Sequence, residues 1–115
     1  MIARVWRGAT RAEDADAYAA YVEHELETAR ALDGNRGTLV LRRLEGDRAE
    51  FVTVLLFGAL DDVRAFAGDD VERAVFYAED ARYLVERDLR VLHYEVDAVI
   101  APNVPWDSPS GPARK

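Results

Sequence analysis

Apolar residues recur along the first hundred residues with two different periods, which predicts strands alternating with helices. Residues 2–7 predict a first strand, and Gly8-Ala9 predicts the turn after it. A helix is then indicated by the capping box formed by Thr10 and Glu13, and by an apolar stripe at three- and four-residue steps. Gly34 is the expected C-cap of this helix, and the stripe comprises Ala15, Tyr18, Ala19, Val22, Leu26 and Ala29.

The middle of the chain predicts a β-hairpin. Its strands cover residues 38–44 and 50–57, joined through residues 45–48. The second strand is apolar on both faces, so both faces need cover. A short helix ended by Gly68 should follow, built on Leu60, Val63, Phe66 and Ala67.

The last third of the domain predicts two short helical turns and a strand. Residues 69–72 carry carboxylates at helix-cap positions and predict a helical turn leading into residues 75–77. Residues 79–84 predict one more turn, and residues 90–99 a strand. In that strand Leu92 and Tyr94 share one face, while Val91 and His93 share the other.

The order β-α-β-β-α-β is the ferredoxin-like arrangement, an α+β fold with a four-stranded antiparallel sheet and the first and third strands at its centre. One long helix and two short ones cover only one face of such a sheet. Because so much apolar surface is rarely left in water, we expect a homodimer packed sheet against sheet. The apolar side chains expected on the uncovered face are Val5, Leu39 or Val40, Val54 and Val91.

The composition sets the domain boundary. The chain has 115 residues, 50% hydrophobic and 32% charged, which suits one globular domain over residues 1–100. All four prolines lie within residues 101–115, so this tail is expected to be disordered or to dock on the partner subunit.

Charge and residue types exclude several classes of partner. With 15 Lys and Arg against 22 Asp and Glu, the net charge is −7, which disfavours nucleic acid and anionic membranes. No apolar run reaches the roughly 18 residues of a membrane span. The absence of cysteine excludes disulfides, thiolate metal sites and a cysteine nucleophile, and suits the cytoplasm.

Four segments of the chain resemble the antibiotic-biosynthesis monooxygenase family. They are residues 1–8 (MIARVWRG), residues 34–37 (GNRG) before 39–43 (LVLRR), residues 65–70 (AFAGDD) and residues 93–96 (HYEV). The resemblance covers nearly all of residues 1–96. It implies a dimeric α+β barrel of two four-stranded sheets, with the helices outside and a ligand cavity in each subunit between sheet and helices. It also implies oxidation of an aromatic polyketide by O2 without metal, flavin or other cofactor.

The chain departs from the family at two places. Many members have a tryptophan at the end of the third strand and a serine two residues later, where this chain has Phe57 and Ala59. The role of that tryptophan does not carry over, although Phe57 is expected to line the cavity. Haem-degrading relatives use an asparagine near the first strand and a histidine on the later helix. Residues 1–8 contain no asparagine and residues 71–84 no histidine, which argues against haem degradation.

The candidates for chemistry are few. No serine precedes residue 108, and His24 and His93 lack the spacing of metal ligands, so neither a catalytic triad nor a metal site is expected. His24 is expected in solvent. His93 and Tyr77 are the candidates for proton transfer. The alternative for His93 is a histidine hydrogen-bonded within the dimer interior.

Substrate binding has its own candidates. Arg4 is predicted to orient an anionic group of the ligand, with an ion pair between subunits as the alternative. The aromatic residues predicted to line the cavity, rather than to fill the core, are Trp6, Phe57, Phe76 and Tyr83.

The sequence thus leads to one functional hypothesis and two alternatives. The hypothesis is a cofactor-independent monooxygenase that acts with O2 on a small aromatic molecule of the polyketide type. The alternatives are a non-oxidative enzyme resembling polyketide cyclases, and a non-catalytic dimer that binds a small ligand or has a structural role.

Overall fold

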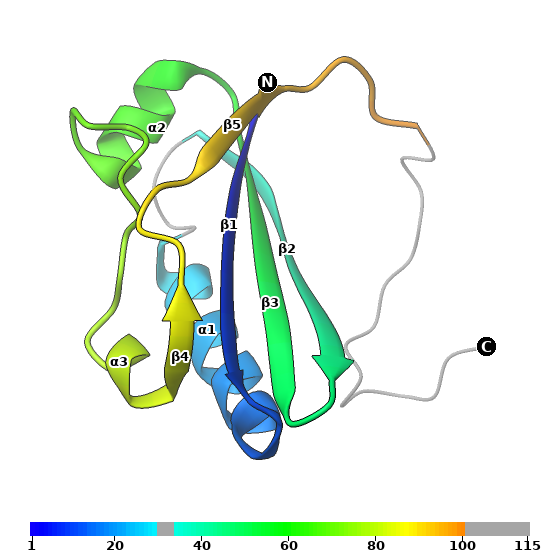
Figure 1. Ribbon diagram of the computed structural model, residues 1–115. Helices are drawn as coiled ribbons and strands as arrows, with labels where there is room; N and C mark the ends of the chain where they lie inside the picture. The colour runs from blue at the N-terminus through cyan, green and yellow to red at the C-terminus, as the bar shows by residue number, and fades with distance from the viewer. Residues whose placement is uncertain (30–33, 101–115) are drawn as a thin grey trace.

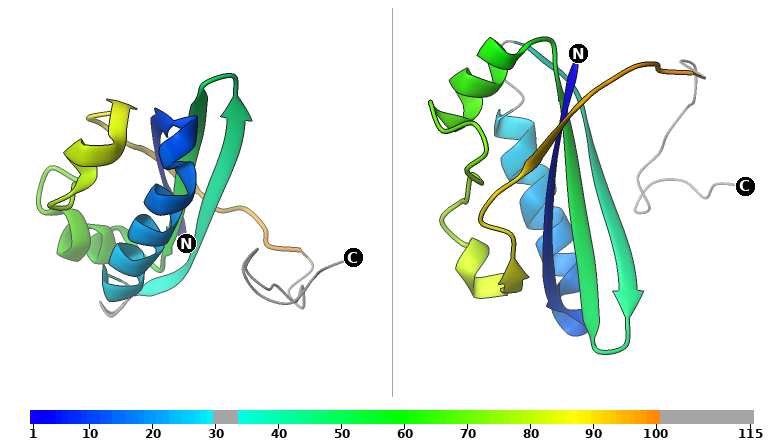
Figure 2. Two further views of the ribbon diagram at one scale, coloured as in Figure 1. Left: turned by 90° about the horizontal axis from the view of Figure 1, so that it is seen from below. Right: turned by 45° about the horizontal axis from the view of Figure 1, so that its top comes forward.

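Five antiparallel strands form an open sheet, with the helices on one face, in a computed structural model that describes residues 1–29 and 34–100 (Figures 1 and 2). The strand order is β2-β3-β1-β4, and β5 also pairs with β1. The elements are β1 (Ile2–Arg11), the 3-10 turn η1 (Ala12–Asp14), α1 (Ala15–Ala29), β2 (Asn35–Glu45), β3 (Arg48–Phe57), α2 (Leu60–Ala67), α3 (Asp80–Tyr83), β4 (Leu84–Arg87) and β5 (Leu92–Glu95).

The central position predicted for the first and third strands is confirmed, since β1 and β3 pair with each other along their whole length. This order is consistent with the ferredoxin-like arrangement, although the sheet has five strands rather than the four expected. The proline-rich tail, residues 101–115, lies outside the described residues.

The turn predicted at Gly8-Ala9 is wrong, because β1 continues to Arg11. Gly8 lies inside the strand where the Trp6 ring lies over it, and a Cβ at Gly8 would sit 2.4 Å from Trp6 Cη2. The capping box is wrong for the same reason. Thr10 is a buried strand residue that pairs with Ala49, and its hydroxyl donates to the carbonyl of Arg11 at 2.8 Å. Pairing with β3 therefore replaces the local helix cap.

The apolar stripe predicted for the long helix is confirmed. Ala15, Tyr18, Val22 and Leu26 of α1 are buried against β3, and Ala19 packs beside them. The edge of the Phe51 ring meets the Tyr18 ring with 4.8 Å between centroids, a favourable aromatic geometry. The buried side chains that complete this core are Ala49, Phe51, Leu55, Phe57 and Val63.

The predicted hairpin is confirmed, with both strands longer than expected and a tight turn at Gly46, whose φ is +63°. The predicted helix after it is also confirmed. In α2 the Asp62 carboxylate accepts the N–H of Ala59 at 3.1 Å, and the helix ends at Gly68 with φ +89°.

Gly34, the C-cap predicted for the long helix, has a φ of +90°, as a C-cap requires, but the four residues before it lie outside the described part of the chain.

The last third of the domain departs most from prediction. The helical turn expected from residue 69 is present only as one hydrogen-bonded turn, in which Arg73 N donates to Asp70 O at 3.0 Å. Residues 68–79 contain no regular helix or strand beyond a bridge between Arg73 and Arg90. Backbone hydrogen bonds to residues 89–91 take its place: Ala74 N donates to Leu89 O at 2.9 Å, and Val91 N to Glu72 O at 2.7 Å. The turn predicted within residues 79–84 is confirmed as α3.

The strand predicted over residues 90–99 is confirmed only in part, as the shorter β5 (Leu92–Glu95), and β4 was not predicted. Two short strands, β4 and β5, pair with successive parts of the same edge of β1, and residues 88–91 separate them (Figure 1). Trp6 accounts for part of this break, because its Nε1 donates to the carbonyl of Asp88 at 2.9 Å. The carbonyl of Asp88 thus binds the Trp6 side chain on β1 instead of a backbone N–H of the sheet.

The face of the sheet turned away from α1 is apolar at one end. A continuous row runs across four strands through Leu39, Val54, Val5 and Leu92. No described helix covers this face (Figure 2). The prediction was wrong for Val91, which is buried on the helical side, and Leu92 with Tyr94 is exposed in its place. Of the two alternatives, Leu39 rather than Val40 lies on the uncovered face. Val40 lies on the helical side, because it pairs with Thr53, which is buried there.

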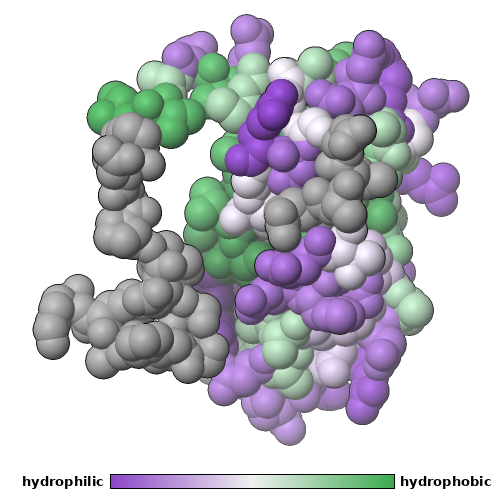
Figure 3. Space-filling model, turned by 180° about the vertical axis from the view of Figure 1, so that it is seen from behind, coloured by the Kyte–Doolittle hydropathy of each residue, from purple (hydrophilic) through white to green (hydrophobic). Residues whose placement is uncertain are grey.

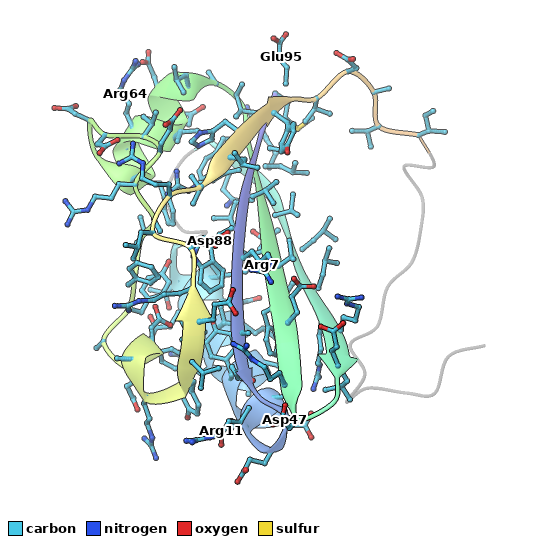
Figure 4. All side chains as sticks on the ribbon, viewed as in Figure 1. Arg7, Arg11, Asp47, Arg64, Asp88 and Glu95 are labelled. Carbon is cyan, nitrogen blue, oxygen red and sulfur yellow. The ribbon has the colours of Figure 1, made fainter. Side chains whose placement is uncertain are left out.

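The other end of the same face is charged. Arg7, labelled in Figure 4, contacts the carboxylates of Glu50 and Glu86, and Arg48 contacts Glu86 at 2.9 Å. The opposite side of the molecule, which carries α1, is largely hydrophilic where it is described (Figure 3). Within the described ranges, no helix has the length and apolar character needed to cross a membrane.

Candidate functional site

A cavity of about 40 Å³ lies between the inner face of the sheet, α1 and the irregular segment before α3. Apolar side chains form much of its wall: Val22 and Leu26 from α1, Leu55 from β3, and Val91 from the segment between β4 and β5. Aromatic rings complete the wall, and among the lining residues Arg4, Tyr18, Tyr77 and Asp80 carry ionisable groups within a mostly apolar space. The aromatic lining residues are Trp6, Tyr18, Phe66, Phe76 and Tyr77.

Arg4 is a buried cation at the sheet side of the cavity. Only 3% of the residue is exposed, and its guanidinium donates to the carbonyls of Val71 at 2.5 Å and Arg73 at 2.7 Å. The guanidinium also lies 5.5 Å from the centre of the Phe66 ring. Burial lowers the pKa of Arg4 to about 10, which leaves it positively charged at neutral pH. The side chain points to the helical side of the sheet and binds carbonyls of its own chain, and the alternative of an ion pair between subunits stays a prediction.

His93 lies beside Arg4 rather than in the cavity wall. The two residues are partners across β1 and β5, with 3.1 Å between Arg4 Nη1 and His93 Nε2. Arg4 and His93 share the helical side of the sheet, and the alternative of a histidine within a dimer interior stays a prediction. Burial and then the charge of Arg4 lower the pKa of His93. A neutral imidazole can accept the Arg4 hydrogen bond, so His93 is placed to orient Arg4.

Tyr77 lies in the cavity wall, as the sequence predicted, but not at the end of a helix. It belongs to the irregular segment before α3, and its hydroxyl is buried without a hydrogen-bond partner among the described residues. Burial, with a contribution from Asp80, raises the pKa of Tyr77 to about 12. The phenol thus stays neutral near pH 7 and can donate a hydrogen bond into the cavity.

Asp80 is the functional candidate that the sequence analysis missed. Only 4% of the residue is exposed, and its Oδ2 accepts the N–H of Tyr77 at 2.6 Å. Its Oδ1 is buried without a partner in the described structure. Burial raises the pKa of this carboxyl, and the Tyr77 N–H opposes the shift. A signal was available, since Asp80 stands three residues from both Tyr77 and Tyr83 and so shares their face of a helical turn.

The aromatic residues predicted as lining divide into two pairs. Trp6 and Phe76 line the cavity, with their ring centres 6.3 Å apart and an edge-to-face arrangement. Phe57 is buried beside Phe66, and Tyr83 packs on the Tyr18 ring at 5.8 Å. Neither Phe57 nor Tyr83 is among the residues that line the cavity. His24 is exposed, as expected.

Unpartnered polar atoms in buried positions are uncommon in native proteins, because each costs about 1–3 kcal/mol. The hydroxyl of Tyr77 and Oδ1 of Asp80 are two such atoms among the residues lining one cavity. Each lacks a hydrogen bond that a ligand able to reach it would supply. Within residues 1–29 and 34–100, no group of three His, Cys, Asp or Glu side chains is arranged to hold a metal ion.

The volume of the cavity limits its occupant. About 40 Å³ accommodates water molecules, whereas benzene is known to enter a cavity of about 150 Å³. An aromatic ligand therefore requires a wall residue to move. Phe76 is suited to this, because it is half-buried and belongs to the irregular segment.

Truncation of this wall residue by Phe76→Ala is expected to lower the free energy of unfolding by about 1–3 kcal/mol, through lost burial and the larger cavity. It is also expected to strengthen the binding of phenol, seen as a larger ligand-induced rise in melting temperature than in the wild type. Tyr83→Ala is the matched control, since it removes a half-buried ring that does not line the cavity. Equal gains in phenol binding for both variants would place the binding site elsewhere.

Comparison with known proteins does not assign the chain to a family. No protein-family model matches the chain, and no curated protein matches it either.

Proposed function

We propose that the protein is a cofactor-independent oxygenase that binds a small aromatic hydroxyl compound in the cavity and promotes its reaction with O2. The observation that carries this proposal is a mostly apolar, aromatic-lined cavity that also contains a buried cation, Arg4, and an unpartnered phenol, Tyr77. The resemblance of residues 1–96 to the antibiotic-biosynthesis monooxygenases supports the same reaction class.

The reaction requires few chemical groups from the protein. An electron-rich phenol or enol loses its hydroxyl proton, and the resulting anion passes an electron to O2. The protein must favour the anion in a site that excludes bulk water. Arg4 supplies positive charge, Tyr77 donates a hydrogen bond to the anionic oxygen, and Trp6 and Phe76 hold the ring. His93 acts as a positioning residue through its contact with Arg4.

We also propose that two copies pair through the apolar end of the sheet, as in a dimeric α+β barrel. The row Leu39, Val54, Val5 and Leu92 supports this, because it is apolar across four strands and no described element covers it. An apolar surface of this kind is characteristic of protein interfaces.

Oxygen consumption tests the reaction. With a panel of anthrones and related phenols, the wild type is expected to consume O2 at a rate that depends on the protein concentration. Tyr77→Phe is expected to lower the rate by about 10- to 100-fold, because the donor to the anion is lost. Tyr83→Phe, which changes a phenol outside the cavity lining, is the control and should retain activity. Absence of O2 consumption with the whole panel contradicts the proposal, and turnover without O2 indicates a non-oxidative cyclase.

A non-catalytic protein that binds a small ligand or has a structural role is the second candidate, because the cavity of about 40 Å³ does not hold an aromatic substrate unless its wall moves. In that case phenol raises the melting temperature, but no compound of the panel is consumed with or without O2.

A further inference from the structure

Two complementary unpartnered atoms belong to neighbouring residues of the cavity wall. The Tyr77 hydroxyl is a donor, and Asp80 Oδ1 is an acceptor when the carboxyl is ionised. The backbone fixes their relation, since the N–H of Tyr77 donates to Asp80 Oδ2 at 2.6 Å. This contact occupies one carboxylate oxygen and leaves the other available to a ligand.

The ionisable groups divide the cavity electrostatically. Tyr77 is influenced by both Arg4 and Asp80, with opposite signs. The cation that acts on Asp80 is Arg87. Tyr77 therefore lies within the electrostatic reach of both a cation, Arg4, and a carboxyl, Asp80. A hydroxyl ligand bound beside Tyr77 comes under the influence of the same two groups, one of which can accept its proton while the other stabilises its anion.

We propose that Asp80 is the proton acceptor of this site: its Oδ1 takes the hydroxyl proton of a phenol or enol, while Tyr77 donates a hydrogen bond to the oxygen left behind. This inference rests on the proposed function and names its base. The ligand O–H bond breaks, a new O–H bond forms on Asp80, and both electrons of the broken bond stay on the ligand oxygen. No oxidant takes part, because electron transfer to O2 belongs to a later step.

The electrostatics of the two residues agree with these roles. Burial raises the pKa of Asp80, which makes its carboxylate a stronger base than an exposed aspartate. The raised pKa of Tyr77, about 12, keeps its proton available as a donor. Proton transfer also moves negative charge from a buried carboxylate toward Arg4. Glu25 of α1 is the other carboxylate that influences both residues, but it does not line the cavity.

The binding of 4-nitrophenol tests this role directly, since only its ionised form is yellow. In the wild type, the bound ligand is expected to be ionised below the pKa of free 4-nitrophenol, with a yellow fraction that stays constant over a range of pH. A constant fraction means that the proton passes to the protein rather than to the buffer. In Asp80→Asn the yellow fraction is expected to fall as the pH falls, because the ligand can ionise only by releasing its proton to solvent.

The variants are chosen to preserve the fold. An asparagine oxygen still accepts the Tyr77 N–H, and Asp80→Asn removes a charge that burial disfavours, so the melting temperature should be retained or raised. Glu25→Gln is the matched control and should keep the wild-type colour profile. If Asp80→Asn fails to fold, the measurement is made on Tyr77→Phe, in which the ionised fraction of bound 4-nitrophenol is expected to be smaller than in the wild type. If 4-nitrophenol does not bind the wild type, the measurement is repeated with Phe76→Ala, and absence of binding there overturns the inference.

The two proposals fail in different ways. Asp80→Asn is expected to lower O2 consumption by about 100-fold or more, the usual effect of losing a general base. If the wild type consumes O2 and Asp80→Asn does so equally well, the role of Asp80 is overturned and the oxygenase stands. If the wild type ionises 4-nitrophenol through Asp80 but consumes no O2 with any compound, the oxygenase is overturned and the proton acceptor stands. A loss of the constant yellow fraction in Glu25→Gln, but not in Asp80→Asn, assigns the proton to Glu25.

Discussion

Replacing Arg4 by methionine is expected to lower the free energy of unfolding by about 2–4 kcal/mol. The substitution keeps most of the length and apolar volume of the side chain but removes every donor. The carbonyls of Val71 and Arg73 then lose their partners, and the segment that carries one wall of the cavity is no longer tied to β1. Because the charge is lost as well, binding of a phenolate should weaken together with stability.

Urea unfolding measures the effect, with Arg64→Met as the control. Arg64 is an exposed arginine of α2 that pairs with Asp61 three residues earlier, at 2.7 Å. Its loss should change the stability by less than about 0.5 kcal/mol. The free energy of unfolding of Arg4→Lys should lie between those of the two variants, since a single ammonium group replaces a guanidinium that donates to two carbonyls. Equal stabilities for Arg4→Met and the control would mean that Arg4 does not hold the wall.

A single charge on the open face of the sheet is expected to dissociate the proposed dimer. Leu92 is 61% exposed in one copy and ends the apolar row on β5. Leu92→Glu is therefore expected to change the free energy of unfolding of a single subunit only slightly. In a sheet-to-sheet dimer it buries two unpaired carboxylates, one from each copy, for a total of about 3 kcal/mol or more, which corresponds to a roughly 100-fold higher Kd.

The molar mass in solution, measured by light scattering over a range of protein concentrations, reports this change. Leu60→Glu is the matched control, because Leu60 is a 40% exposed leucine on α2, away from the sheet face. The control should keep the dimer mass at concentrations where Leu92→Glu is monomeric. A wild type that remains monomeric at micromolar concentration would falsify the proposed assembly.

The elements that were predictable are those in which local pattern and tertiary contacts agree. The stripe of α1 needs only one apolar partner surface, and β3 provides it. The turn at Gly46 and the end of α2 at Gly68 both depend on a positive φ that glycine adopts readily. In these places the side chains themselves determine the backbone.

The elements that were not predictable depend on contacts distant in sequence. Thr10 has a good local cap pattern, but pairing with Ala49 outweighs it. The alternation within β5 was predicted correctly, yet the covered face was not, because it is set by the pairing of His93 with Arg4, 89 residues earlier in the chain. The break at residues 88–91 likewise follows from Trp6 and the segment around Arg73.

The candidate site shows the same division. Arg4, Trp6, Phe76 and Tyr77 were identified as chemically suitable residues, and the fold brings them to one cavity. Asp80 was overlooked because a carboxylate beside a short turn is usually solvated. Only the packing of α3 against the Tyr18 ring and its neighbours shows that this one is buried.

The backbone of the wall that carries Tyr77 is hydrogen-bonded to the segment between β4 and β5. Ala74 N donates to Leu89 O and Val91 N to Glu72 O, so these two amide protons are protected only while the wall is in place. Both residues are buried. Their exchange with deuterium therefore measures how often the cavity opens, independently of any substrate. A ligand that holds the wall closed slows exchange at these two amides, and one that holds it open accelerates it.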